Sequence, residues 1–314
     1  MHPAFSVIAF TTLSGAGYGL LFLLGLAYAR APLPLSREFA LVLVGLATLL
    51  VLLGLLSSVL HLGQPQRAWR ALSQWRSSWL SREGVAAIAS LVPVAALAAL
   101  VWRGDFGLAL RLSAIAIAVL ALLTVYCTAR IYTSLRAIPA WTDRAVLPAY
   151  LLIGLWTGAL LGWALLALTG IGLGRMPAIA MLATALSVGA LKLGYWRRMA
   201  TRGLPDTGEV TGLGRLGRVR QFEAPHTEAS YLTREMGFVL ARRHAARLRR
   251  IALVLLVAVP LACVAWAYWN GAGIAAPALA AAAALIGAVV ERWLFFAEAR
   301  HVVMAYYGVP GPAA

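Results

Sequence analysis

Residues 40–70 read ALVLVGLATLLVLLGLL (40–56) followed by SSVLHLGQPQRAWR (57–70), and the change between these two parts decides the fold. The first part is apolar except for Thr48, and its length approaches the roughly 20 residues that a helix needs to cross a bilayer. The second part gathers two serines, a histidine, a glycine, a proline and two arginines directly after the apolar run. We therefore predict a membrane-spanning helix that ends in a polar cluster at the membrane surface.

The rest of the chain repeats the apolar part of this pattern. Of its 314 residues, 62% are hydrophobic and only 12% are charged, which is far from the composition of a water-soluble domain. Long apolar runs without alternating polar residues form helices in lipid rather than barrels. The runs are Ala4–Ala29, Phe39–Leu60, Gly84–Trp102, Leu108–Thr128, Val146–Thr169, Pro177–Trp196, Ile251–Asn270 and Ala275–Ala297. We predict an all-α integral membrane protein, a bundle of eight transmembrane helices that forms one polytopic domain over residues 1–314.

Positive charge is unevenly divided between the two sides of the predicted bundle. The net charge is +16, and Lys192 is the single lysine. Twenty arginines lie in the loops after the even-numbered helices and in the C-terminal tail, against five in the loops after the odd-numbered helices. Because short arginine-rich loops stay in the cytoplasm, we place the even-side loops, both termini and His61 on the cytoplasmic side. Basic loops beside anionic lipid explain this charge without a nucleic-acid partner, and we expect none.

A basic insertion, residues 195–250, separates the sixth and seventh helices and is predicted to be a long cytoplasmic loop. Its first half is rich in glycine and proline, so we expect it to be irregular. Its second half, Thr227–Arg250, is predicted to be an arginine-rich helix with an apolar face. Such a helix either lies on anionic membrane lipid or docks a soluble partner, and both interpretations stay open.

No metal site, haem or iron–sulfur cluster is expected in this chain. Cys127 and Cys263 are the only cysteines, lie far apart and form no CxxC pair, so they cannot hold a cluster or a structural zinc ion alone. A membrane haem needs two axial ligands that face one another, usually histidines. Of the five histidines only His61 and His301 could meet, and both lie at predicted helix ends.

His61 carries the strongest functional signal in the sequence. A titratable imidazole at a bilayer edge suits proton exchange with a lipid-soluble molecule. Quinone reduction or oxidation moves two electrons and two protons, so it requires a proton-exchanging group at such an edge. We predict that His61 exchanges the proton and that Arg67 or Arg70 stabilises the quinone oxygen. The competing interpretation is an interfacial cap, in which Pro65 ends the helix and the arginines meet lipid headgroups.

A secondary transporter is the alternative from a different functional class. Transporters place ionisable residues near the bilayer midplane. The predicted spans are nearly free of charge, and the candidates are Lys192 and a buried partner, Glu291. Lys192 lies near a cytoplasmic helix end, where its side chain could reach the interface. Transport is therefore the weaker interpretation.

Three stretches resemble the membrane-anchor subunit of DMSO reductase-type molybdoenzymes. They are LHLGQPQRA (60–68), RIYT (130–133) with Pro139 and Trp141, and ERWLFF (291–296) followed by His301. The first is the most specific, and the resemblance covers most of the eight-helix body. It implies an integral subunit that binds menaquinone or ubiquinone and carries no haem. It also implies two partners, an iron–sulfur (ferredoxin-like) subunit and a molybdopterin-containing catalytic subunit.

The resemblance also assigns site residues. In that family the histidine and glycine of the His-Leu-Gly stretch belong to the quinol site, which corresponds here to His61 and Gly63. Pro65, Arg67 and Tyr132 follow from the same matching stretches. The implied protein does not act on the substrate itself. It is the quinone-reactive anchor subunit of an oxidoreductase complex in the bacterial inner membrane, with its partners docked on the cytoplasmic side.

Two branches of this family remain as alternatives. The insertion at 195–250 is longer than in DMSO reductase anchors, and the arginine distribution places the partners in the cytoplasm. With the opening HPAFSVI (2–8), these features resemble the anchor of cytoplasmic sulfite-oxidising quinone oxidoreductases. We expect sulfite oxidation with quinone reduction, and the alternative is a DMSO- or TMAO-type reductase that oxidises menaquinol. The partner's substrate, the quinone type and the direction of electron flow are left open because this protein does not contact the substrate.

Overall fold

The computed structural model describes residues 4–60, 62–202, 205–220, 222–223, 240–271 and 273–307. His61, the central residue of the predicted site, lies outside these ranges, as does the part of the predicted Thr227–Arg250 helix that precedes Leu240. The described part of the chain contains helices and no strands. Eight of its helical segments are long and apolar enough to cross a membrane, which confirms the predicted all-helical membrane bundle.

The spans match the predicted apolar runs to within a few residues at most ends. They are α1 Phe5–Arg30, α2 Arg37–Val59, α3 Trp79–Arg103, α4 Leu108–Thr133, α5 Val146–Ala167, α6 Arg175–Thr201, a composite of α9 Leu240–Leu253, η3 Val254–Ala258 and α10 Val259–Asn270, and α11 Ala275–Ala297. Several ends carry the expected capping residues. The side chain of Ser36 accepts a hydrogen bond from the backbone N–H of Phe39, and Gly104 ends α3 in the left-handed region, with φ of 72°.

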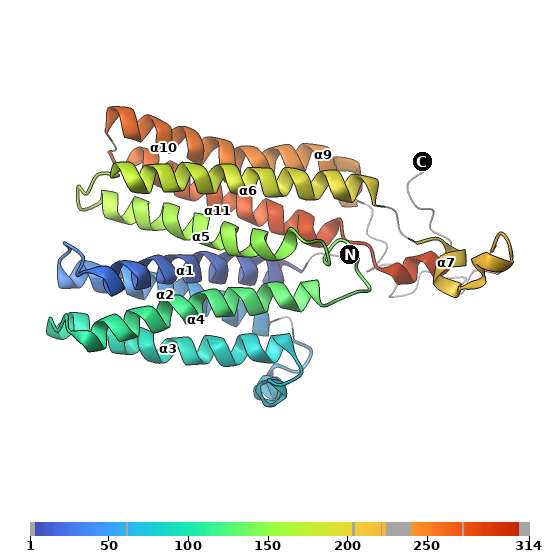
Figure 1. Ribbon diagram of the computed structural model, residues 1–314, viewed down its shortest axis with the longest axis horizontal. Coiled ribbons are helices and arrows are strands. Elements are labelled where there is room, and N and C mark those ends of the chain that lie inside the picture. Colours follow the sequence, from blue (N-terminus) through green and yellow to red (C-terminus); the bar gives the residue numbers. More distant parts are fainter. Residues whose placement is uncertain are drawn as a thin grey trace.

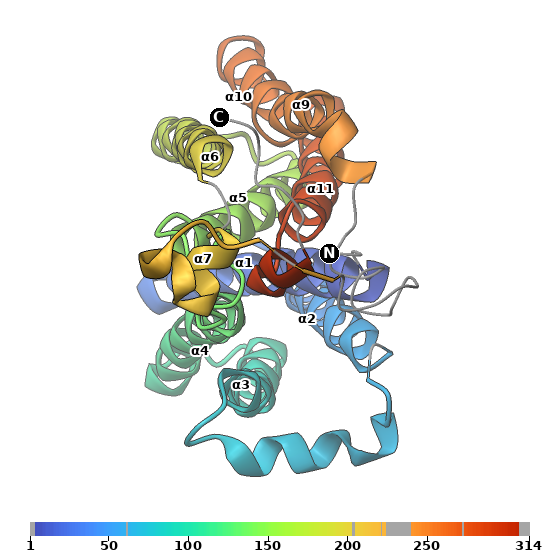
Figure 2. The ribbon, with the colours of Figure 1, turned by 90° about the vertical axis from the view of Figure 1, so that its right-hand side faces the viewer.

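Helix α1 lies at the centre of the bundle and contacts α2, α4, α5 and α11 (Figure 2). Its crossing with α5 depends on glycine, because a Cβ atom on Gly19 would collide with the carbonyl oxygen of Gly154. A Cβ atom on Gly158 would likewise collide with the backbone nitrogen of Leu20. Small residues at such positions let two membrane helices approach closely, and this contact fixes α1 against α5.

The seventh span is interrupted by the π-helical segment η3. Pro260 has no backbone N–H, so it cannot donate to the carbonyl of Leu256 four residues earlier. That carbonyl accepts a hydrogen bond of 2.7 Å from the indole N–H of Trp156 on α5 instead. On the other side, Gly287 of α11 packs so closely against Leu256 that a Cβ atom there would collide with its backbone nitrogen. The carbonyl group left free at this irregular turn is therefore hydrogen-bonded within the protein, because the interior of a bilayer offers no water to replace that bond.

The loops after the even-numbered spans gather at one end of the bundle (Figure 1). This end holds the helical linker η1 Pro65–Gln74 and, farther out, α7 Thr207–Thr211, η2 Leu213–Leu216 and η4 Val302–Tyr307. The first half of the insertion is thus more ordered than its glycine content suggested. A capping box explains the start of α7, since the side chains of Asp206 and Glu209 each accept a hydrogen bond from the other's backbone N–H.

Candidate functional site

The predicted site residues that the structure describes lie mainly on the linker between α2 and α3. Gly63, Pro65, Arg67 and Arg70 are exposed or nearly so, either on η1 or on the segment leading into it. Figure 2 shows this linker crossing the even-side end outside α3. The guanidinium group of Arg70 lies 5.5 Å from the ring centre of its neighbour Trp69. Both arginines are therefore available to lipid headgroups or to a ligand that approaches along the membrane surface.

Leu72 connects this linker to the start of α3. The hydroxyl of Ser81 donates a hydrogen bond of 3.0 Å to the carbonyl oxygen of Leu72. A Cβ atom on Gly84 would lie 2.8 Å from the Leu72 side chain, so glycine leaves room for this contact. The linker thus covers the first turns of α3 at the membrane edge.

The first turns of α3 also carry a buried carboxyl group, that of Glu83. Its exposed fraction is 3%, and it accepts a hydrogen bond from the hydroxyl of Thr128 on α4. The ion pairs found among the described residues do not include Glu83. A buried carboxyl group without a cation partner is costly to ionise, so it is suited to hold a proton and exchange it.

A group of aromatic and cationic side chains lies around Trp79 on the same two helices, α3 and α4. The guanidinium groups of Arg82 and Arg130 lie 4.3 and 5.0 Å from the ring centre of Trp79. The ring of Tyr126 meets Trp79 edge-on at 5.9 Å. The Nε atom of Arg130 is buried and has no hydrogen-bond partner among the described atoms. This N–H is a donor that a ligand oxygen could use.

Tyr132 was predicted to join this site, but the structure places it in a different group of side chains. Its ring packs at 5.3–5.7 Å from four aromatic rings. They belong to Trp141, Tyr150, Phe295 and Phe296, and join α4, the following loop, α5 and α11. Tyr132 lies in this core cluster, whereas Arg67 and Arg70 lie on the linker outside α3. The structure therefore does not bring Tyr132 together with the two arginines.

A second polar centre lies between α6 and α11. The Nζ atom of Lys192 lies 2.5 Å from Oε1 of Glu291, and Nε of Arg292 lies 3.4 Å from Oε2 of the same carboxylate. All three side chains are buried. The guanidinium group of Arg292 also stacks on the ring of Tyr150, with 3.6 Å between the guanidinium carbon and the ring centre.

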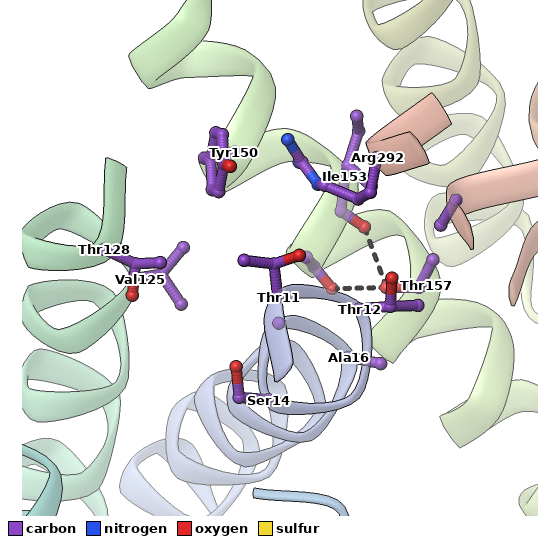
Figure 3. A pocket seen from close by; sticks show the side chains of 13 residues that line it. Thr11, Thr12, Ser14, Ala16, Val125, Thr128, Tyr150, Ile153, Thr157 and Arg292 are labelled. Atoms are coloured by element: carbon purple, nitrogen blue, oxygen red, sulfur yellow. Dashed lines mark hydrogen bonds between the residues drawn. The ribbon is translucent and has the colours of Figure 1, made fainter. Parts of the chain in front are cut away.

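A small polar cavity separates this centre from Glu83. It is formed by α1, α4, α5 and α11, and its polar lining includes Thr11, Thr12, Ser14, Thr128, Tyr150, Thr157 and Arg292. Figure 3 shows Arg292, Tyr150, Thr11 and Thr128 facing this common space. Its volume of about 10 Å³ fits a single water molecule.

A larger cavity of about 440 Å³ lies near the opposite end of the bundle, between α1, α5 and α6. Leu20, Trp163 and Met181 are typical of its apolar lining, which contains no titratable side chain. This cavity suits an acyl or isoprenoid tail, but it offers no group for proton exchange. The chemistry therefore points to the even-side end.

The sequence interpretation missed Glu83 and Arg130 as functional candidates. Both stand at the margins of predicted spans, where a charged residue is commonly read as an interfacial anchor. Acidic residues are nevertheless rare in membrane spans and are retained there mainly for function. That rarity is the signal in the sequence that could have identified Glu83.

Comparison with known proteins identifies the family. The profile of the family described as DMSO reductase anchor subunit (DmsC) matches residues 1–297. The chain is similar to a sulfite dehydrogenase subunit of Allochromatium vinosum. The identity is 33% over an alignment of 322 positions, which covers 98% of this sequence and 99% of that protein. It is also similar to one polypeptide of the anaerobic dimethyl sulfoxide reductase of Escherichia coli, with 33% identity over 143 residues that cover 43% of this sequence and 48% of that protein. This chain, an eight-span membrane protein, belongs to the DMSO reductase anchor subunit family.

Proposed function

We propose that this chain is the quinone-reactive membrane anchor of a molybdopterin and iron–sulfur oxidoreductase, and that it passes electrons between its partners and the quinone pool. The observation that carries the proposal is the position of Glu83. Its carboxyl group is buried at the even-side end and accepts a hydrogen bond from Thr128, while Ser81, two residues earlier, is hydrogen-bonded to the linker that follows His61. A membrane-embedded acid at this depth can exchange protons with a lipid-soluble molecule that cannot leave the bilayer.

The donor set fits a quinone headgroup. Quinone, when bound, supplies two-electron chemistry that is balanced by two protons, and its two oxygens accept hydrogen bonds. Glu83 would exchange a proton at one oxygen, and the free Nε–H of Arg130 would donate to an oxygen of the ring. His61, in the linker, would connect the site to bulk water, while Arg67 and Arg70 hold the linker at the headgroup region.

Electrons must come from a partner subunit. The chain has two cysteines, both buried in different spans, whereas an iron–sulfur cluster needs about four cysteine ligands. Both relatives are named as one part of a larger enzyme, which agrees with assembly into a complex. We therefore infer an iron–sulfur subunit that contacts this chain and a molybdopterin subunit that acts on the substrate.

The partner would dock on a projection at the even-side end. We define the α7–η4 projection as residues 207–216 and 302–307. It is held together by hydrogen bonds from the Thr207 hydroxyl to the carbonyl of Ala305 and from the Tyr306 hydroxyl to the carbonyl of Val210. In Figure 1 it extends past the helix ends along the bundle axis. It exposes Leu216 beside arginines, which suits an acidic protein surface better than a membrane.

Orientation and direction follow from two further observations. The arginine-rich loops share one end of the bundle, and the positive-inside rule assigns that end to the cytoplasm of a bacterial inner membrane. The relative that matches over nearly its whole length is named for sulfite dehydrogenation, whereas the match to the dimethyl sulfoxide reductase polypeptide covers less than half of this sequence. Sulfite oxidation with quinone reduction is therefore the proposed direction, and quinol-dependent sulfoxide reduction is the second candidate.

The test uses the complex purified with its partner subunits in lipid nanodiscs. Sulfite-dependent reduction of a soluble quinone is compared with sulfite-dependent reduction of ferricyanide, an acceptor that bypasses the membrane site. We expect Glu83→Gln and His61→Ala to lower quinone reduction by about 10²- to 10⁴-fold while ferricyanide reduction persists. The matched control is Glu38→Gln, which removes an exposed carboxylate at the opposite end. Normal quinone reduction in both site variants would overturn the proposal.

The same preparation distinguishes sulfite oxidation from the second candidate, quinol-dependent sulfoxide reduction. Quinol-dependent reduction of dimethyl sulfoxide without sulfite oxidation would reverse the assigned direction and leave the membrane site in place. Solute uptake by vesicles that contain this protein without partners would instead favour the transporter alternative.

A further inference from the structure

A series of buried polar side chains extends across the bundle from α6 to α3. It begins with Lys192, whose Nζ atom lies 2.5 Å from the carboxylate of Glu291. The same carboxylate lies 3.4 Å from Arg292, and Arg292 stacks on Tyr150 at 3.6 Å. Each of these four side chains is buried.

The series continues through the small polar cavity. The hydroxyl groups of Tyr150 and Thr12 are buried at its wall and have no hydrogen-bond partner among the described atoms. On the far wall, the hydroxyl of Thr128 donates to the carboxyl group of Glu83. A single water molecule in this cavity would use both free hydroxyls and complete the connection to Thr128.

The charges along this series are balanced only as a set. If every group is ionised, Lys192 and Arg292 carry two positive charges, and Glu291 and Glu83 carry two negative charges. If a proton moves from Lys192 to Glu83, the total is again zero. The total is zero whenever the four groups together hold this number of protons, and one proton more or fewer leaves a net charge inside the bilayer, which is costly. Arginine cannot release a proton, so Lys192 is the cation that can exchange one.

Resting on the quinone function proposed above, we propose that Lys192 and Glu83 form a two-site proton store, in which protons pass between them through Tyr150, Thr12 and Thr128. Glu83 then gives its proton to a quinone oxygen, and Lys192 restores it. The proton store gives a role to the buried ionic group, which the anchoring function alone leaves unexplained.

The step balances for each proton. Glu83–COOH becomes Glu83–COO⁻ as the proton moves to the quinone oxygen, and the electron arrives from the partner's iron–sulfur cluster. Lys192–NH₂ takes a new proton from the cytoplasm and becomes Lys192–NH₃⁺, which returns to Lys192–NH₂ as its proton restores Glu83–COOH. Two such cycles complete one quinol. Quinol oxidation would run the same steps in reverse.

The entrance for new protons lies at the outer side of Lys192. Glu298, which follows α11, is paired with Arg249 of α9 at 2.8 Å and is partly exposed. Charged or titratable groups face Lys192 from each packed element. They are Tyr195 on α6, Tyr150 on α5, Glu291, Arg292 and Glu298 on or after α11, and Arg249 on α9. Glu298 is the carboxylate of this group nearest to water and is the expected entrance.

The first experiment measures how the charge of Lys192 affects the protonation of Glu83, without catalytic turnover. Infrared spectra of the purified complex in nanodiscs would show the C=O band of protonated Glu83, identified by its loss in Glu83→Gln. Lys192→Arg fixes the positive charge, so we expect the band to shrink to less than half. Lys192→Met removes that charge, so we expect the band to grow and to persist at higher pH. An unchanged band in both variants would overturn the proton store.

The second experiment measures transfer. Tyr150→Phe and Thr12→Val each remove one free hydroxyl and keep the packing, and Tyr150→Phe also keeps the ring under Arg292. We expect each of them, and Lys192→Arg, to slow sulfite-dependent quinone reduction by about tenfold or more and to raise its solvent deuterium isotope effect. The matched controls are Tyr28→Phe and Thr48→Val, which lie away from the series and should keep the wild-type rate.

The outcomes separate this inference from the function on which it rests. Ferricyanide reduction reports the amount of assembled enzyme in every variant. If Glu83→Gln abolishes quinone reduction while Lys192→Arg, Tyr150→Phe and Thr12→Val keep the wild-type rate and isotope effect, the proton store is wrong and the quinone site stands. If Glu83→Gln also keeps the wild-type rate, the quinone function itself fails.

Discussion

The indole N–H of Trp156 and the carbonyl oxygen of Leu256 are 2.7 Å apart and join two spans that are 100 residues apart in the sequence. The carbonyl is available because Pro260 cannot donate to it, and Trp156 is completely buried. In lipid no water can replace this bond. We expect Trp156→Phe to lower the free energy of unfolding by about 1–3 kcal/mol, measured by denaturation of the purified protein in detergent.

A second variant tests whether Pro260 is the reason that the carbonyl of Leu256 is free to bond Trp156. Pro260→Ala restores an N–H that can bond the carbonyl of Leu256, so Trp156→Phe should cost less in that background than in the wild type. A double-mutant cycle measures this coupling, and strict additivity would contradict the explanation. Trp102→Phe, at a residue that is 64% exposed, is the control for removing an indole.

The crossing of α1 and α5 gives a second stability prediction. Gly19→Ala would drive a methyl group into the carbonyl oxygen of Gly154, and the backbones must separate to admit it. We expect a loss of about 1–3 kcal/mol in the free energy of unfolding, measured by the same denaturation. Gly45→Ala is the matched control, because a Cβ atom there would meet nothing within 4 Å. Equal stability of the two variants would show that the helices separate at no cost.

The eight spans could be predicted from the sequence because the bilayer requires length and hydropathy, and both are local properties. The rotation of each helix about its axis could not be predicted. The apolar residues of α1 are spread around the whole helix, so its pattern does not show that Gly19 faces α5 and that Ser14 faces Gly54. Tyr132 shows the same limit, since the sequence does not show the side of α4 from which it projects.

Only part of the candidate site could be predicted, because contacts between spans are not local in the sequence. The linker with Gly63, Pro65 and Arg67 could be found because polar residues gather there in sequence. The contact between Thr128 and Glu83 joins residues 45 positions apart and depends on how α3 meets α4. Hydropathy patterns do not contain that relationship, so Glu83 emerged only from the structure.

The ion pair between Asp143 and Arg198 predicts a pH dependence outside the membrane. Two hydrogen bonds of 2.7 and 2.9 Å join the guanidinium group to the carboxylate. Burial works to raise the pKa of Asp143, but the hydrogen bonds from Arg198 and from the backbone N–H of Ala145, with the charges of Arg198 and Arg202, lower it below its ordinary value. The pair therefore stabilises the folded protein fully above the ordinary carboxyl pKa of 3.8 and loses this contribution as the pH falls through the lowered value.

Asp143→Asn removes this dependence. Because Arg198 is about a third exposed, we expect a loss of only about 1 kcal/mol at pH 7. The difference between wild type and variant should shrink as the pH falls below 3.8, which detergent denaturation at several pH values would measure. A difference that grows toward acid pH would contradict the assigned ionisation.

The α7–η4 projection predicts where the iron–sulfur partner is held. Leu216, the last residue of η2, is 86% exposed, and Arg215 and Arg218 are close to it in the sequence. An apolar contact surrounded by basic residues is typical of a docking surface for an acidic protein. Leu216→Asp places a negative charge in that contact, so we expect the partner to bind about tenfold more weakly, which corresponds to about 1.4 kcal/mol.

The measurement is the fraction of sulfite-dependent ferricyanide reduction that stays with washed membranes. Leu168→Asp is the matched control, because Leu168 is 55% exposed at the opposite end of the bundle, where no partner is expected. Higher salt should release more enzyme from the wild type if basic residues contribute, since screening weakens exposed charge contacts. Partner retention that falls equally in the two variants would show that the loss arises from damage to the membrane protein. Retention that is unchanged by Leu216→Asp would place the docking surface elsewhere on the even-side end.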